Sequence, residues 1–99
     1  MNTQHEILDF LKDHKAYLES EYHVSKIGLF GSFARHEQSE KSDVDIIFDF
    51  KPDTPHIYDI KEALKVYLSA ALGRSVDLAR EKYLKPYAKS EILKNVIYV

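Results

Sequence analysis

The segment from Asp43 to Phe50 constrains the fold of this chain more than any other, because acidic and apolar residues alternate along it. Its apolar residues occupy every second position: Val44, Ile46, Phe48 and Phe50. This period is typical of a β-strand that buries one face. Asp43 and Asp45 then project together from the opposite face. A shift of one residue would place both acids in the core, so the apolar residues fix the register.

The other segments predict helices around a small sheet. We expect a helix over residues 3–22 that begins with the capping box of Thr3 and Glu6. The further elements expected along the chain are a strand over 26–30, a short helix over 33–35, a loop over 36–42, the strand over 43–50, a helix capped by Thr54 and ended by Gly73, a strand over 75–79 and a final helix over 84–96. This order indicates a two-layer α+β (α/β) fold with about three strands.

Length and composition indicate a single globular domain and exclude several kinds of protein. Ninety-nine residues predict one domain over residues 1–99, and 44% hydrophobic with 30% charged residues is typical of a soluble globular chain. A net charge of −2 argues against a protein whose main task is to coat nucleic acid. The absence of cysteine excludes disulfides, thiolate metal sites and a cysteine nucleophile. With neither a signal peptide nor a membrane-spanning segment expected, we predict a cytoplasmic protein.

The acid pair predicts a divalent cation site. Two carboxylates on one strand face repel each other unless a cation neutralises them or protons are taken up. Asp43 and Asp45 offer hard oxygen ligands, which suit Mg²⁺ together with water and phosphate oxygens. The alternative is a solvent-facing strand edge on which the acids have no ligand. Taken alone, the pair fits that alternative better.

Gly31 and Ser32 lie between the first predicted strand and the short helix. There, backbone N–H groups and a hydroxyl can face an anion, and a glycine lets a phosphate approach the backbone closely. An ordinary turn in which Ser32 caps the helix explains the same residues. The turn and the acid pair together predict a phosphate site that faces a metal site.

Asp77 supplies a third carboxylate if the third strand lies beside the second. Three acids, two metal ions and a triphosphate are the components of in-line nucleotidyl transfer. Asp77 would then act as a metal ligand or accept the proton of the attacking hydroxyl. The alternative is an acid on an edge strand that faces water.

At this point the sequence resembles a known family. Gly31-Ser32, ten further residues and then Asp43-Val44-Asp45 are similar to the signature of DNA polymerase β-like nucleotidyltransferases. The segments 29–35, 42–46 and 72–78 and the ending from Leu84 resemble the minimal nucleotidyltransferases, which are antitoxin partners of HEPN-domain toxins. The likeness covers nearly the whole chain.

The resemblance implies a mixed sheet, phosphate binding by Gly31 and Ser32, and metal binding by Asp43 and Asp45, with Asp77 as third acid. It further implies ATP as donor, Mg²⁺ as cofactor, and a tyrosine of a HEPN toxin as acceptor, so that the toxin is silenced by AMP. One departure is His36, which stands where many relatives carry glycine.

Some residues carry weaker predictions. Arg35 can contact triphosphate oxygens or pair with a surface acid, and Asp49 is expected to be a strand-end residue. The tyrosines show no stacking arrangement in the sequence, but any exposed near the C-terminus can line a protein interface. Two other functions remain open: a non-catalytic antitoxin that neutralises its partner by covering it, and transfer to a small molecule such as an aminoglycoside.

Overall fold

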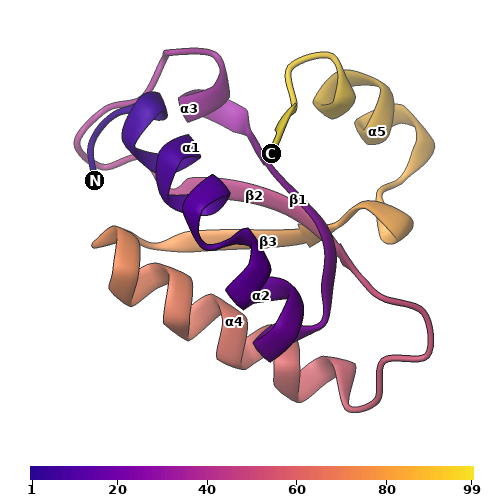
Figure 1. The fold of residues 1–99 in the computed structure, drawn as a ribbon. Coiled ribbons are helices and arrows are strands. Elements are labelled where there is room, and N and C mark those ends of the chain that lie inside the picture. Colours follow the sequence, from indigo (N-terminus) through magenta and orange to yellow (C-terminus); the bar gives the residue numbers. More distant parts are fainter.

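The computed structural model describes all 99 residues and contains a four-stranded mixed sheet with helices (Figure 1). Its elements are α1 (Gln4–Asp13), α2 (Lys15–Tyr22), β1 (Val24–Phe30), α3 (Gly31–Ala34), β2 (Val44–Phe50), α4 (Ile57–Leu72), β3 (Val76–Arg80), the 3-10 helix η1 (Glu81–Tyr83), α5 (Pro86–Leu93) and β4 (Ile97–Tyr98). The strand order is β3-β2-β1-β4, with β1 antiparallel to β2 and β4, and β2 parallel to β3. The predicted α+β class is confirmed.

The main core lies on one face of this sheet. The alternate residues Val44, Ile46 and Phe48 of β2 are fully buried there, as the sequence predicts. Buried residues of α1, α2, α3, α4, β1 and β3 complete the same cluster. Ile47 is also fully buried, although it lies on the acidic face and outside the main cluster. The face that carries the acids is therefore only partly open to water.

The predicted first helix is interrupted. His14, with φ −102° and ψ 8°, separates α1 from α2. Both halves contact β1, so the bend lets each keep its buried residues on the sheet. At the N-terminus Thr3 Oγ1 accepts from the Glu6 N–H at 3.1 Å, as expected for the cap.

The long helix α4 also differs from the expectation at its start. Thr54 does not cap it: the Thr54 hydroxyl donates to the Lys51 carbonyl at 2.6 Å, and His56 is the capping residue. Gly73 ends the helix at φ +68°, as predicted. No helix of the chain has the length and apolar character needed to span a membrane.

A fourth strand, β4, was not predicted, because two residues are too few to show a strand period. It pairs with the middle of β1, where Gly28 lies opposite Tyr98. A Cβ built on Gly28 would lie 2.9 Å from the Ile97 carbonyl oxygen. The missing side chain of Gly28 therefore lets the C-terminal segment pass close to the sheet.

Three tyrosines contact one another through tilted and edge-on rings, without stacking. Tyr17, Tyr22 and Tyr67 form a cluster with ring centroids 5.4–6.1 Å apart. Phe10 joins it at 6.5 Å from Tyr67 and stacks on His14 at 4.0 Å. The cluster joins α1, α2 and α4. It escaped the sequence because its members are distant along the chain.

Candidate active site

The sheet places the predicted site residues side by side across three strands. In the β1–β2 pair Phe30 lies opposite Asp45, and Gly31 follows Phe30 directly. In the parallel β2–β3 pair Asp45 lies opposite Asp77. Asp45 therefore lies between the glycine turn and the third acid, with Asp43 just before the strand. The structure brings together the four positions that sequence reasoning could only assume to be close.

Gly31 lies so close to Asp45 that a side chain at this position would overlap the carboxylate. A Cβ built on it would lie 2.0 Å from Oδ2 of Asp45 and 2.8 Å from Cγ. Gly31 also has φ +72°, in the left-handed region that favours glycine. The turn and the carboxylate are therefore packed so closely that no other residue type fits between them.

The charges of the three acids act on one another. The pKa of Asp45 is raised above its ordinary value of 3.8, first by burial, then by the neighbouring charges of Asp77 and Asp43, while Arg35 opposes the shift. Asp43 and Asp77 are exposed and Asp45 is partly buried. None of the three carboxylates forms an ion pair with a lysine, arginine or histidine. The site thus holds negative charge that the protein itself leaves uncompensated.

The donor set fits a hard divalent cation. Carboxylate oxygens with unfavourable mutual charge are ligands that Mg²⁺ accepts, and it usually needs only one or two of them beside phosphate and water. No group of three or more Asp, Glu, His or Cys side chains is arranged as a metal site in the structure. Asp43 and Asp45 are the pair that would hold such a cation, with Asp77 opposite Asp45 on the neighbouring strand.

Arg35 and His36 follow the glycine turn. Arg35 is exposed, pairs with Glu37 at 3.2 Å and lines a hollow with Phe30, Gly31, two residues of α5 and Asn95. Both predictions for Arg35 therefore have support. Arg35 pairs with a surface acid, and it also borders the glycine turn. His36 has φ +57°, which explains why a glycine suits this position.

Asp49 is the last residue but one of β2, as expected for a residue near the strand end. Its carboxylate accepts from Arg80 Nε at 3.0 Å and from the Lys82 backbone N–H at 2.9 Å. The side chains of Asp49 and Arg80 are only 15% and 12% exposed. Asp49 is therefore a structural acid at the opposite end of β2 from Asp45.

Arg74 is the residue near the site that sequence reasoning missed. Its guanidinium donates to three carbonyl oxygens in the segment before Asp43, those of Ser39, Glu40 and Ser42, at 3.0–3.2 Å. It also donates to the Met1 carbonyl and to Asn2 Oδ1. The same group lies 5.1 Å from the centroid of the Phe33 ring. An arginine immediately after Gly73 gives no sequence signal for a loop more than 30 residues away.

The comparisons with known proteins agree with this geometry. A family model described as a nucleotidyltransferase domain matches residues 11–99. The chain belongs to the nucleotidyltransferase domain family. It is 41% identical over 99 residues to the protein adenylyltransferase MntA of Thermococcus cleftensis, covering 100% of this chain and 98% of that protein. It is 43% identical over 102 residues to a Methanocaldococcus jannaschii protein provisionally named a protein adenylyltransferase, with full coverage of both.

Solved structures show the same fold. A structure provisionally named a minimal nucleotidyltransferase superposes with a TM-score of 0.76 at 28% identity, over 93% of this chain and 92% of that one. A toxin–antitoxin complex with AMP-PNP gives a TM-score of 0.66 at 22% identity, over 96% of this chain and 70% of that one. The chain is thus a nucleotidyltransferase by family, and its fold is that of the minimal members.

For this nucleotidyltransferase we expect Arg74→Lys to loosen the segment before Asp43. Lysine keeps the charge but loses the planar fork that reaches several acceptors at once. The amides of residues 39–43 should exchange hydrogen for deuterium faster, and unfolding free energy should fall by about 1–3 kcal/mol.

Arg80→Lys is the matched control, because Arg80 is held by Asp49 at the other end of the sheet. It should lower stability without changing exchange at residues 39–43. Equal exchange of this segment in both variants and the wild type would contradict the role of Arg74.

Proposed function

We propose that this chain is a Mg²⁺-dependent protein adenylyltransferase that acts as an antitoxin. It transfers AMP from ATP to a tyrosine hydroxyl of a HEPN toxin and so neutralises it. The observation that carries the proposal is the position of Asp45, an acid with raised pKa between the Gly31 turn and Asp77.

Each residue has a role that its position allows. The Gly31–Ser32 turn holds the phosphates, with Arg35 beside it. Asp43 and Asp45 hold the cation, and Mg²⁺ when bound supplies charge neutralisation at the phosphates and a lower pKa of the acceptor hydroxyl. Asp77 orients the acceptor hydroxyl and takes up its proton.

The reaction exchanges one bond to phosphorus for another. The acceptor oxygen forms a bond to the α-phosphorus of ATP, and the bond from that phosphorus to the pyrophosphate oxygen breaks. The products are an AMP-modified side chain, pyrophosphate and the proton that leaves the hydroxyl. The chain's own contribution is to place these groups and to hold the proton.

The names of relatives support a protein as the acceptor. The Thermococcus protein that is 41% identical is named a protein adenylyltransferase, and so, provisionally, is the Methanocaldococcus protein at 43%. Both match this chain over its whole length. A protein acceptor also suits an open site whose third acid is exposed at the edge of the sheet.

A direct test is intact-mass spectrometry of candidate toxins. A HEPN-like protein encoded beside this chain would be incubated with it, Mg²⁺ and each of the four nucleoside triphosphates. We expect addition of AMP from ATP, and no addition when EDTA removes the metal. The absence of nucleotide addition from any triphosphate would contradict the proposal.

A non-catalytic antitoxin is the second candidate, because tyrosines are exposed on the surface, including Tyr58 at 84% and Tyr83 at 65%. Such a surface can cover a partner without chemistry. The double variant Asp43→Asn/Asp45→Asn separates the two candidates. If it silences the toxin as well as the wild type does, binding alone is sufficient.

A further inference from the structure

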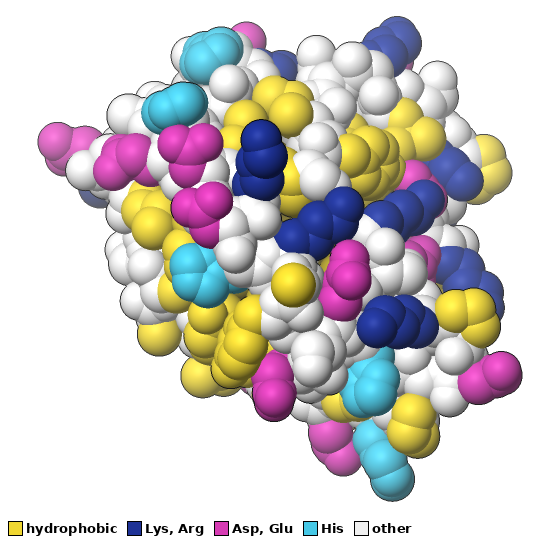
Figure 2. Space-filling view, viewed as in Figure 1, with side chains coloured by type: hydrophobic (Ala, Val, Ile, Leu, Met, Phe, Trp, Pro, Cys, Tyr) yellow, Lys and Arg dark blue, Asp and Glu magenta, His cyan; other side chains and the backbone are white.

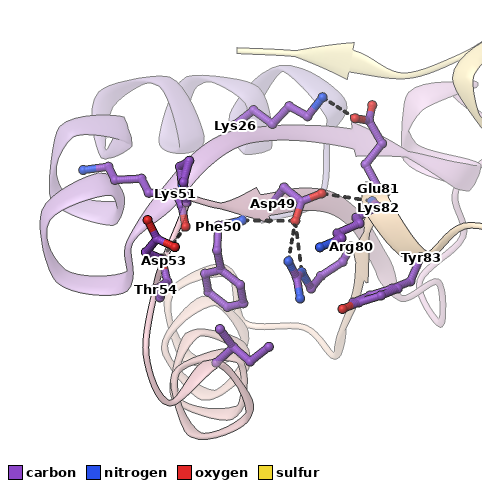
Figure 3. Close-up of a pocket in the computed structure, with 12 residues that line it drawn as sticks. Lys26, Asp49, Phe50, Lys51, Asp53, Thr54, Arg80, Glu81, Lys82 and Tyr83 are labelled. Carbon is purple, nitrogen blue, oxygen red and sulfur yellow. Dashed lines mark hydrogen bonds and ion pairs between the residues drawn. The ribbon is translucent and has the colours of Figure 1, made fainter.

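Three neighbouring hollows form a continuous surface along β3 and the first half of α4. The largest, about 600 Å³, lies around the ends of β2 and β3 (Figure 3). It shares Phe50, Ile57, Arg80 and Tyr83 with a second hollow. The second shares Tyr58 and Lys61 with a third, which is lined by Asp77. We call the three hollows together the β3-edge surface. Asp77, the third acid of the site, lies at one of its ends.

The topology makes this surface the acceptor side. β3 is an edge strand that pairs with β2 alone. Gly31 and Asp77 therefore flank Asp45 from opposite sides, since one follows β1 and the other lies on β3. In phosphoryl-type transfer the attacking and leaving oxygens are roughly in line. If the glycine turn holds the leaving pyrophosphate, the acceptor oxygen arrives from the side of Asp77.

The hollow beside Asp77 has the size of a side chain rather than a nucleotide. Its volume is about 270 Å³, below the range of roughly 300–1,000 Å³ that small-molecule sites occupy. Tyr58, Lys61 and Lys65 line it at helical spacing on α4. An acceptor side chain can therefore enter there while the rest of its chain lies on the neighbouring hollows.

The β3-edge surface has a net charge of +1, from six lysine and arginine and five acidic residues, in contrast to the net charge of −2 of the whole chain. Four of its lysines have no ion-pair partner: Lys51, Lys61, Lys65 and Lys82. The unpaired acids that line it are three: Asp53, Glu62 and Asp77. In Figure 2, Lys and Arg side chains gather where Figure 1 places the ends of β2 and β3. This charge is complementary to an acidic partner.

Aromatic rings flank Arg80 at the centre of the surface. The Arg80 guanidinium lies 5.0 Å from the Phe50 ring centroid and 4.8 Å from that of Tyr83, and it forms an ion pair with Asp49 (Figure 3). Ile57 and Tyr58 extend the apolar area with exposed fractions of 39% and 84%. Aromatic anchors beside an arginine, with charges around them, are typical of protein-binding surfaces.

The geometry points to the β3-edge surface as the docking site of the acceptor protein, which binds through an acidic segment that lies along β3 and presents its hydroxyl to Asp77. This inference rests on the proposed function for the identity of the reaction. The inference goes beyond the proposed function because it assigns the position and the charge of the partner. It also assigns Lys61, Lys65 and Tyr58 as residues that select the acceptor.

The test uses two synthetic probes and the isotope-labelled chain. A random copolymer of glutamate and tyrosine and one of lysine and tyrosine are titrated separately, and amide chemical shifts are followed by NMR. We expect the acidic copolymer to shift amides of β3 and of α4 from Ile57 to Lys65, and to bind more weakly as salt rises. The basic copolymer should not bind there.

The decisive variant is Lys61→Glu/Lys65→Glu, which should weaken binding of the acidic copolymer about tenfold or more. Lys12→Glu/Lys15→Glu makes the same change of charge on α1 and α2, at residues that line none of the hollows, and should leave the affinity unchanged. Tyr58→Ala removes an 84% exposed side chain without disturbing the core, and should also weaken binding.

Three outcomes would overturn the docking site: no binding of the acidic copolymer, shifts confined to another surface, or equal affinity of the two lysine double variants. Failure of the proposed function looks different. A wild-type chain that binds the acidic copolymer along β3, but transfers no nucleotide to any candidate toxin, keeps the docking site and loses the reaction.

Discussion

Asp45→Asn is expected to lower AMP transfer by about three orders of magnitude, or about 4 kcal/mol of transition-state stabilisation. Asparagine keeps the shape of the side chain but loses the charge that holds the cation. Asp45 lies between Gly31 and Asp77, so no other carboxylate of the sheet can take its position. The measurement is the initial rate of AMP incorporation into the acceptor at saturating ATP and Mg²⁺. Asp43→Asn should likewise abolish transfer with the fold retained.

We expect Asp45→Asn to lower the activity without lowering the stability of the fold. Because the pKa of Asp45 is raised in the folded state, ionisation of this group costs stability. The cost is absent below the unfolded-state pKa and develops as pH rises through the folded-state pKa. At neutral pH, without metal, the variant should be at least as stable as the wild type by thermal denaturation.

Asp49→Asn is the matched control, since it makes the same chemical change four residues along the same strand. Asp49 holds Arg80 and the Lys82 N–H, so its loss should lower the unfolding free energy by about 1–3 kcal/mol. At saturating acceptor concentration transfer should continue, because this end of β2 is remote from Gly31 and Arg80 belongs to the docking surface rather than to the reacting groups. A similar loss of transfer in both variants would show that the effect of Asp45 is only structural.

Gly31→Ala should lower transfer at least about a hundredfold through displacement of the Asp45 carboxylate. The new methyl group would lie 2.0 Å from Oδ2 and 3.0 Å from Cβ of Asp45, so the whole side chain must rotate away. Alanine at φ +72° adds about 1–2 kcal/mol of backbone strain. The affinity for nucleotide in the presence of Mg²⁺, measured by calorimetry, should fall together with the rate of transfer.

Gly73→Ala separates strain from displacement. Gly73 has φ +68°, nearly that of Gly31, but its new Cβ would meet nothing closer than the Met1 nitrogen at 3.9 Å. It should therefore cost a similar strain energy and leave transfer almost unchanged. Equal activity of the two alanine variants would refute the close packing of Gly31 on Asp45 as a requirement of the site.

Much of the fold could be predicted from local sequence patterns. The alternation along β2, the capping by Thr3 and the end of α4 at Gly73 all follow from nearest neighbours in sequence, and each is found where expected. The break at His14, the short strand β4 and the pairing of Asp49 with Arg80 do not. Each of these depends on packing between segments that are distant along the chain, for which one sequence carries no periodic signal.

The site divides in the same way. The alternation along β2 was enough to predict which side chains share a face, because its buried residues permit one register, and Gly31–Ser32 was enough to predict the turn after β1. Three features follow from packing across the fold: Asp77 lies beside Asp45, Gly31 packs against the same carboxylate, and Arg74 binds the segment before Asp43. The physical reason is that strand order and loop closure are set by burial and hydrogen bonding across the whole core, whereas the face of a residue is set by its immediate neighbours.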